Sequence, residues 1–306
     1  MRAGGALRVA AVAVAGDRAA RTEQRRDPVG HARALRRARV GRRSGGTGYH
    51  LAESPAGSDP AGRRREEAMA RVTARAGAVN PVEATIFRHG MAALRREGIP
   101  FLVAGAYAVE RYTGLARHTK DLDVLILPRD QDAAIAALGA AGFQDYFTVD
   151  PYDRRWIYRA HDASTIFDVI WAFANQLEQV TPDWFARARS GEFLGEIVPF
   201  AAPEDLIWMK LFVLQRTRCD WPDIVNIIRG TRGRLDWCAL VRNLGEHCVL
   251  LGGAIHLYDW LCPAERDFIP DFVRQVVEAA AAPTQPCRAA LLDSRPWLAE
   301  AGVAQL

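Results

Sequence analysis

The stretch KDLDVLIL at residues 120–127 places two aspartates, Asp121 and Asp123, in an otherwise apolar run. A second apolar run, IFDVIW at residues 166–171, contains a third aspartate, Asp168. Aspartate is disfavoured in β-strands and is almost never buried without a partner. Three aspartates in two strand-like runs therefore indicate a site where a cation gathers the carboxylates, and a divalent metal ion is the simplest candidate.

The spacing of these aspartates predicts how they meet. Alternate residues of a strand share a face, so Asp121 and Asp123 lie side by side while Leu122 and Val124 face the core. If the two strands are neighbours, Asp168 joins the pair at one sheet edge. An Asp-x-Asp motif on its own is more often a cap at the edge of a strand than a pair of metal ligands. The third aspartate, in a separate apolar strand, favours the metal site. Two Mg²⁺ ions about 4 Å apart, with Mn²⁺ as the alternative, would relieve the repulsion and suit phosphoryl transfer.

A glycine turn precedes the aspartate pair. Gly105 and Ala106 follow the apolar run FLVAG at residues 101–105 and open a short predicted helix over residues 106–112. Backbone amides at such a helix start favour phosphate, and glycine permits close approach. Many strand–helix junctions contain glycine only for the turn, but this one lies 16 residues before Asp121. It therefore supports a nucleotide-binding role for both residues.

Taken together, VAGA at residues 103–106, DLDV at residues 121–124 and Asp168 resemble the pattern of the DNA polymerase β-like nucleotidyltransferase superfamily. The resemblance covers about residues 80–230. Within the superfamily, the sequence pattern is most similar to that of bacterial uncharacterised nucleotidyltransferases and of the toxin-type transferases of abortive-infection systems. It implies an α+β fold, with a small mixed β-sheet nucleotidyltransferase domain, flanking helices and a C-terminal helical domain. Ala106 replaces the family's usual Gly or Ser, which removes a hydroxyl contact to phosphate, and the gap to the aspartate pair is slightly long.

The resemblance also implies an activity. The protein would be a metal-dependent nucleotidyltransferase that moves NMP from an NTP, ATP being the expected nucleotide, to a hydroxyl on RNA, protein or a small molecule, with release of pyrophosphate. Asp121 and Asp123 would bind the metals that bridge the triphosphate. Asp168 would bind the catalytic metal and help deprotonate the acceptor. An antitoxin or other operon protein is the expected partner. The alternative is a catalytically inactive toxin–antitoxin or regulatory module, for which Ala106 leaves room.

Lysine usage points to further site residues. The chain has 38 Arg but only two Lys, Lys120 and Lys210. Ammonium and guanidinium groups are not interchangeable at a phosphate site. We expect Lys210 to be catalytic by neutralising phosphate oxygens, and Lys120, Arg216 and Asp223 to bind the nucleotide. The structural alternative for this charged stretch is that Asp220 caps the following helix.

Composition divides the chain into three predicted parts. Residues 1–77 contain 17 Arg against 7 acidic residues, a net charge of +10, and are expected to be a disordered Arg/Ala/Gly-rich leader, with Met69 as an alternative start. Residues 78–202 are the predicted catalytic domain and residues 203–306 the helical domain. The rest of the chain has a net charge of −6, so only the leader could act as a nucleic-acid-binding arm, the less favoured interpretation.

The pattern predicts individual elements as well. Strands are expected over residues 101–105, 121–127, 143–149, 156–160, 165–171 and 192–200. Helices are expected over residues 81–97, 106–112, 131–138, 204–215, 222–229, 236–244, 253–261 and 270–281.

Neither a membrane span nor a disulfide framework is indicated. No apolar run approaches the ~20 residues that a spanning helix needs. The five cysteines are odd in number, widely spaced and without a C-x-x-C pair, which predicts reduced core thiols in a cytoplasmic protein.

Overall fold

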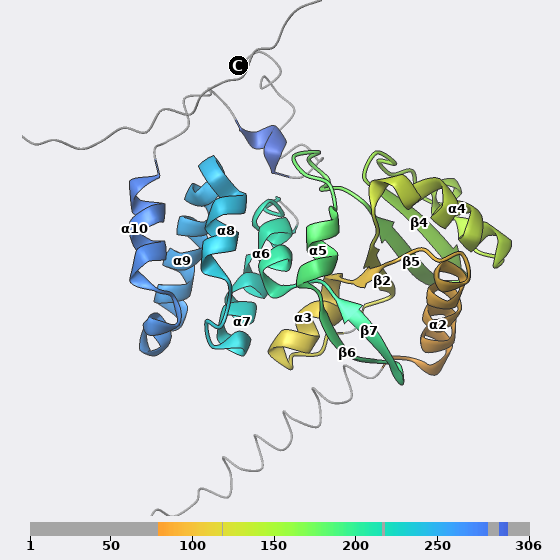
Figure 1. Cartoon of the computed structure of the whole chain (residues 1–306), viewed down its shortest axis with the longest axis horizontal. Helices are drawn as coiled ribbons and strands as arrows, with labels where there is room; N and C mark the ends of the chain where they lie inside the picture. Colours follow the sequence, from red (N-terminus) through yellow and green to blue (C-terminus); the bar gives the residue numbers. More distant parts are fainter. Residues whose placement is uncertain (1–78, 118, 216–217, 281–287, 293–306) are drawn as a thin grey trace, which may run out of the picture. The chain divides into compact units, whose positions relative to one another are not determined.

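The computed structural model describes residues 79–117, 119–215, 218–280 and 288–292 (Figure 1). These residues form an α+β fold around a seven-stranded mixed sheet with the order β3-β4-β5-β2-β1-β7-β6, which confirms the predicted fold class. They all belong to one compact unit, Ser58–Leu306. The predicted leader and the alternative start at Met69 lie outside the described residues, and the boundary at residue 202 stays a prediction.

The centre of the sheet is β2 (Asp121–Leu125), which runs parallel to β5 (Thr165–Ile170) and antiparallel to the short β1 (Leu102–Val103). Leu122 and Val124 of β2 are fully buried, as the alternation predicts. The antiparallel strands β4 (Ile157–Asp162) and β3 (Gln144–Asp145) extend the sheet beyond β5. On the other side, β7 (Glu196–Phe200) is parallel to β1 and pairs with β6 (Arg189–Phe193).

Two helices pack on the sheet face opposite Asp168. Helix α2 (Pro81–Arg96) begins where the Asn80 side chain accepts a hydrogen bond from the Val82 amide, as an N-cap residue does. A Cβ on Gly90 of this helix would lie 2.5 Å from the ring of Phe167, which faces away from Asp168. Helix α4 (Gln131–Ala140) packs beside α2. The Asp168 face is thereby left free for other elements.

Helix α3 (Gly105–Thr113) follows β1 directly and packs against α6 (Pro203–Leu211) and α7 (Trp221–Thr231). The contact with α7 is close, because a Cβ on Gly230 would lie 2.2 Å from the backbone oxygen of Tyr112. The helices α8 (Trp237–Leu244), α9 (Cys248–Leu261) and α10 (Asp271–Ala279) follow, with α9 packing against α7 and α10 (Figure 1).

Three local predictions need correction. Residues 143–149 form only the two-residue β3 and a 3-10 turn, because the Asp145 carboxylate accepts from the Phe147 amide and ends the strand. Residues 192–200 are not one strand, because Leu194 and Gly195 adopt positive φ of 54° and 82° and turn the chain between β6 and β7. Helix α5 (Pro182–Arg187) was not predicted.

No helix within the described ranges is long and apolar enough to cross a membrane. Cys219, Cys238, Cys248 and Cys262 are free thiols, and Cys287 lies outside the described residues. Cys219 and Cys238 are exposed, so the prediction of core thiols was wrong for these two.

Candidate functional site

The three aspartates come together because β2 and β5 are neighbours. Their parallel register places Asp123 directly opposite Asp168, with Asp121 one two-residue step along the same face of β2. The Asp168 side chain is 3% exposed, whereas that of Asp121 is 36% exposed. The structure therefore brings together the three carboxylates that the sequence singled out.

A cation that the sequence analysis missed already contacts this group. Arg159 lies on β4 opposite Asp168, and its Nε and Nη2 atoms donate to Asp168 Oδ1 and Oδ2 at 2.9 and 2.8 Å. Its Nη2 also lies 3.9 Å from Asp121 Oδ2. Arg159 lies between Tyr158 and Ala160, and the sequence alone gives it no partner.

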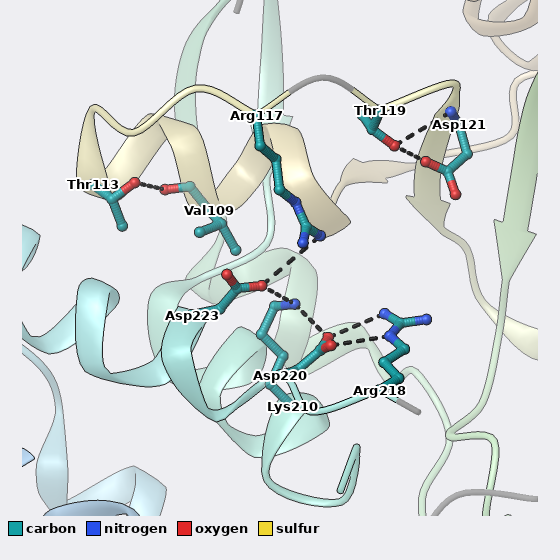
Figure 2. A network of polar contacts seen from close by, with 9 residues as sticks. All are labelled: Val109, Thr113, Arg117, Thr119, Asp121, Lys210, Arg218, Asp220 and Asp223. Atoms are coloured by element: carbon teal, nitrogen blue, oxygen red, sulfur yellow. Dashed lines mark hydrogen bonds and ion pairs between the residues drawn. The ribbon is translucent and has the colours of Figure 1, made fainter. Parts of the chain in front are cut away.

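The two carboxylates of β2 have different surroundings. Asp121 accepts a hydrogen bond from the Thr119 hydroxyl (Figure 2). The Asp123 carboxylate makes no hydrogen bond or ion pair with any residue that the structure describes. Among those same residues, the side chains as they stand form no group of three His, Cys, Asp or Glu able to hold a metal ion. Asp121 and Asp123 offer the hard oxygen donors that Mg²⁺ requires, whereas Arg159 occupies both oxygens of Asp168.

The crowding of carboxylates has an electrostatic consequence. Burial, followed by repulsion from Asp121 and Asp168, raises the pKa of Asp123 from 3.8 to about 7, while Lys210 and Arg218 act in the opposite direction. Burial likewise raises the pKa of Asp168 to about 6, although Arg159 favours its charged form. Among the described residues, Lys210 and Arg218 therefore do not offset the burial of Asp123 and the repulsion from its neighbouring carboxylates.

Gly105 allows helix α3 to begin against this carboxylate. Its φ is +55°, and a Cβ at this position would lie 1.7 Å from Asp123 Oδ2. Only glycine fits such a contact in the left-handed region. The next residue, Ala106, is buried at the first turn of α3 and, like the three aspartates, lines a cavity that is described below. The predicted glycine turn therefore lies beside the carboxylates.

Lys210 forms the centre of a second charged cluster (Figure 2). Its buried Nζ donates to Asp220 Oδ2 and Asp223 Oδ2, both at 2.8 Å. Arg218 Nε donates to Asp220 Oδ1 at 2.9 Å, and Arg117 Nη2 lies 3.9 Å from Asp223 Oδ2. This lysine is thus held by two carboxylates of its own.

Asp220 does not cap helix α7 with its side chain, as the sequence had suggested, but forms ion pairs instead. Asp220 occupies the N-cap position of α7, yet its carboxylate accepts no hydrogen bond from that helix. Although burial opposes the effect, Arg218 and Lys210 lower its pKa from 3.8 to about 2. Of the other predicted nucleotide ligands, Lys120 is exposed and outside the cavity lining, and Arg216 lies outside the described residues.

One cavity of about 1130 Å³ joins these features. Its lining includes Gly105, the three aspartates, Arg159, Lys210, Arg218 and Asp220, together with apolar residues from the segment before β4 and from α6. Sites for one drug-sized ligand usually occupy about 300–1,000 Å³, so this cavity is slightly larger than the usual range.

Comparisons with known proteins identify a family. The family model described as "Uncharacterised nucleotidyltransferase" matches residues 35–253. A search of curated proteins finds no match.

Solved structures give distant likenesses. The antibiotic-resistance factor ANT(2'')-Ia is 16% identical over 62% of this chain and 100% of its own, with a TM-score of 0.39. The lincomycin-bound lincosamide antibiotic adenylyltransferase LnuA is 15% identical over 49% of this chain and 96% of its own, with a TM-score of 0.36. An antigenic nucleotidyltransferase-like protein from Paracoccidioides brasiliensis is 15% identical over 48% of this chain and 75% of its own, with a TM-score of 0.31. At these scores the likenesses carry no functional argument.

Proposed function

This chain belongs to the family of uncharacterised nucleotidyltransferases, and on that basis we propose that it transfers NMP from an NTP, with ATP as the expected nucleotide, to a hydroxyl acceptor. The acceptor oxygen forms a bond to the α-phosphorus, the bond from that phosphorus to the α–β bridging oxygen breaks, and pyrophosphate leaves. The observation that carries the proposal is the register of β2 and β5, which places Asp123 opposite Asp168 beside the start of α3.

Each carboxylate has a role in this proposal. Asp121 and Asp123 would hold Mg²⁺, which supplies positive charge to the triphosphate oxygens when bound. The backbone at Gly105 and Ala106 would face the phosphates at the positive end of α3. Asp168 would take the proton of the acceptor hydroxyl, which requires that Arg159 release at least one of its oxygens. Catalysis would consist mainly of positioning and charge neutralisation.

Lys210 receives a revised role. Because its ammonium is bound by Asp220 and Asp223, it would act on the phosphates through its field and by fixing the α6–α7 junction. Arg218 also lines the cavity, and because its side chain is 55% exposed it could contact a nucleotide phosphate while it stays paired with Asp220.

The experiment is transfer of label from [α-³²P]ATP to a cell extract in the presence of Mg²⁺. Asp123→Asn should lower transfer at least about 100-fold, because even groups that only support a metal ligand change activity by 10–100-fold. Asp267→Asn, which alters an exposed aspartate far along the chain, is the matched control and should keep full activity. Undiminished transfer by Asp123→Asn would refute the proposed site.

The finer parts of the proposal concern biological context. If the protein belongs to the toxin-type branch, with an antitoxin or operon protein as partner, induced expression should arrest growth and Asp123→Asn should not. No observation within the described residues favours an inactive partner module. The four free cysteines described above support the expected cytoplasmic location.

A further inference from the structure

We propose that the acceptor is a small hydroxylated molecule with an apolar face, uncharged or cationic, rather than RNA or protein. The inference rests on the proposed nucleotidyl transfer and narrows its acceptor. It comes from the way the cavity lining changes along the sheet.

The floor of the cavity changes from charged to apolar within one step. On β4 and β5, Arg159 pairs with Asp168, and Ile157 pairs with Ile170. Alternate residues share a face, so the isoleucine pair lies on the same face as the charged pair, about 7 Å along the strands. All four residues line the cavity. A molecule whose hydroxyl reaches Asp168 would therefore extend over Ile157 and Ile170, which are 3% and 6% exposed and offer only a small apolar surface.

The walls beside this floor are also apolar. Phe147, Tyr152 and Trp156 contribute from the segment before β4, and Met209 and Val213 contribute from α6 and the residues after it. Phe147 is 37% exposed, although burying a side chain of this type stabilises by about 1.5–3 kcal/mol. The Arg154 guanidinium lies over the Phe147 ring, 4.1 Å from its centre, and a ligand in the cavity would cover more of this partly exposed aromatic wall.

The cavity cations are already paired, which disfavours a polyanionic acceptor. Within the described lining, Arg159 is bound to Asp168, Lys210 and Arg218 to Asp220, and Arg117 lies near Asp223. An RNA chain would bring additional phosphates, and RNA affinity depends on cations available to neutralise them.

The charge at the apolar end disfavours an anion as well. Asp150 and Asp153 line this part of the cavity. The two arginines nearby are both paired, Arg155 with Asp153 and Arg154, which lies over the Phe147 ring, with Asp145. The Asp150 carboxylate would repel phosphate or carboxylate groups and would attract a cation.

The test uses the full chain, [α-³²P]ATP, Mg²⁺ and a cell extract divided into macromolecules, small molecules retained on a reversed-phase resin, and small molecules not retained. Label is expected in the retained small-molecule fraction. Label on RNA, on protein or on unretained small molecules would overturn this inference and leave the proposed function standing. Absence of label in every fraction would overturn both.

Variants connect the result to the apolar floor. With the retained fraction as acceptor, Ile170→Thr should raise the acceptor KM about tenfold and leave the KM for ATP unchanged, since small changes in an apolar pocket have effects of this size. Ile197→Thr, at a 71% exposed position of β7, is the matched control. Phe147→Ala, at a 37% exposed position of the 3-10 turn after β3, should act like Ile170→Thr with a smaller effect on stability. An unchanged acceptor KM in both cavity variants, or equal changes in both KM values, would overturn the inference.

Discussion

Arg159 and Asp168 face each other on neighbouring antiparallel strands, and the guanidinium of the arginine donates to both oxygens of the carboxylate at 2.8–2.9 Å. A carboxylate held in this way cannot offer the same lone pairs to a metal ion. Arg159 therefore competes with any cation that Asp168 is to bind, while it keeps the buried carboxylate paired in the meantime.

We expect Arg159→Gln to bind Mn²⁺ about tenfold more tightly than the unaltered protein, because a hydrogen bond to a charged group contributes about 1.5 kcal/mol. Titration followed by electron paramagnetic resonance measures the free Mn²⁺ directly. Arg229→Gln is the control, since Arg229 makes a similar two-point contact with Glu265 in the helical region. Equal or weaker Mn²⁺ binding by Arg159→Gln would contradict the competition.

Gly105→Ala should abolish Mn²⁺ binding and transfer, because the new Cβ would fall 1.7 Å from Asp123 Oδ2 and displace that carboxylate. Gly98→Ala separates this clash from backbone strain. Gly98 has a φ of +66° and an open surrounding, so this control should lose about 1 kcal/mol of stability and keep Mn²⁺ binding. If both variants bind Mn²⁺ equally well, Gly105 does not position Asp123.

Lys210→Met should lower the free energy of unfolding by about 3 kcal/mol, because it leaves two partly buried carboxylates without their shared cation. Urea unfolding at neutral pH measures this change. Lys120→Met, at the other lysine of the chain, removes an exposed ammonium and should stay within about 0.5 kcal/mol. A small effect at Lys210 would instead favour a purely catalytic role.

Asp220 should make stability depend on acid pH. Its pKa is lowered from 3.8 to about 2 in the folded state, so the unfolded chain takes up its proton first as the pH falls. The carboxylate therefore contributes about 2 kcal/mol above about pH 4, and this contribution is lost as the pH falls through about 2.

The measurement is urea unfolding of the protein and of Asp220→Asn between neutral pH and about pH 2.5. The difference in free energy of unfolding between the unaltered protein and Asp220→Asn should shrink with falling pH. In a Lys210→Met background, this difference should be smaller at every pH. A difference that does not vary with pH would show that the ion pairs do not stabilise the folded state.

The core of the site could be predicted from sequence because its signals are local. The alternation around Asp121 and Asp123 defines which face they share, and an apolar run around Asp168 marks a second strand. Placing Asp123 opposite Asp168 required only that these strands be neighbours, which the register confirms. The start of α2 was readable for a similar reason, since Asn80 caps it within two residues.

The parts that were missed depend on contacts between distant residues. Arg159 becomes part of the site only through its pairing with β5, and nothing beside it in the chain indicates a partner. Lys210 was expected to face phosphate, but the turn into α7 brings Asp220 and Asp223 to it first. The turn between β6 and β7 begins at Leu194, which is not a residue typical of turns. The sequence pattern therefore predicted a single strand over the two.

The contact between Gly230 and the Tyr112 backbone has an evolutionary consequence. A side chain at residue 230 would separate α7 from α3, the helix whose first residue adjoins Asp123. Helices α3 and α7 can therefore change at this crossing only together. Exchange of the C-terminal helices between relatives would succeed only where the incoming segment also has a glycine at this crossing.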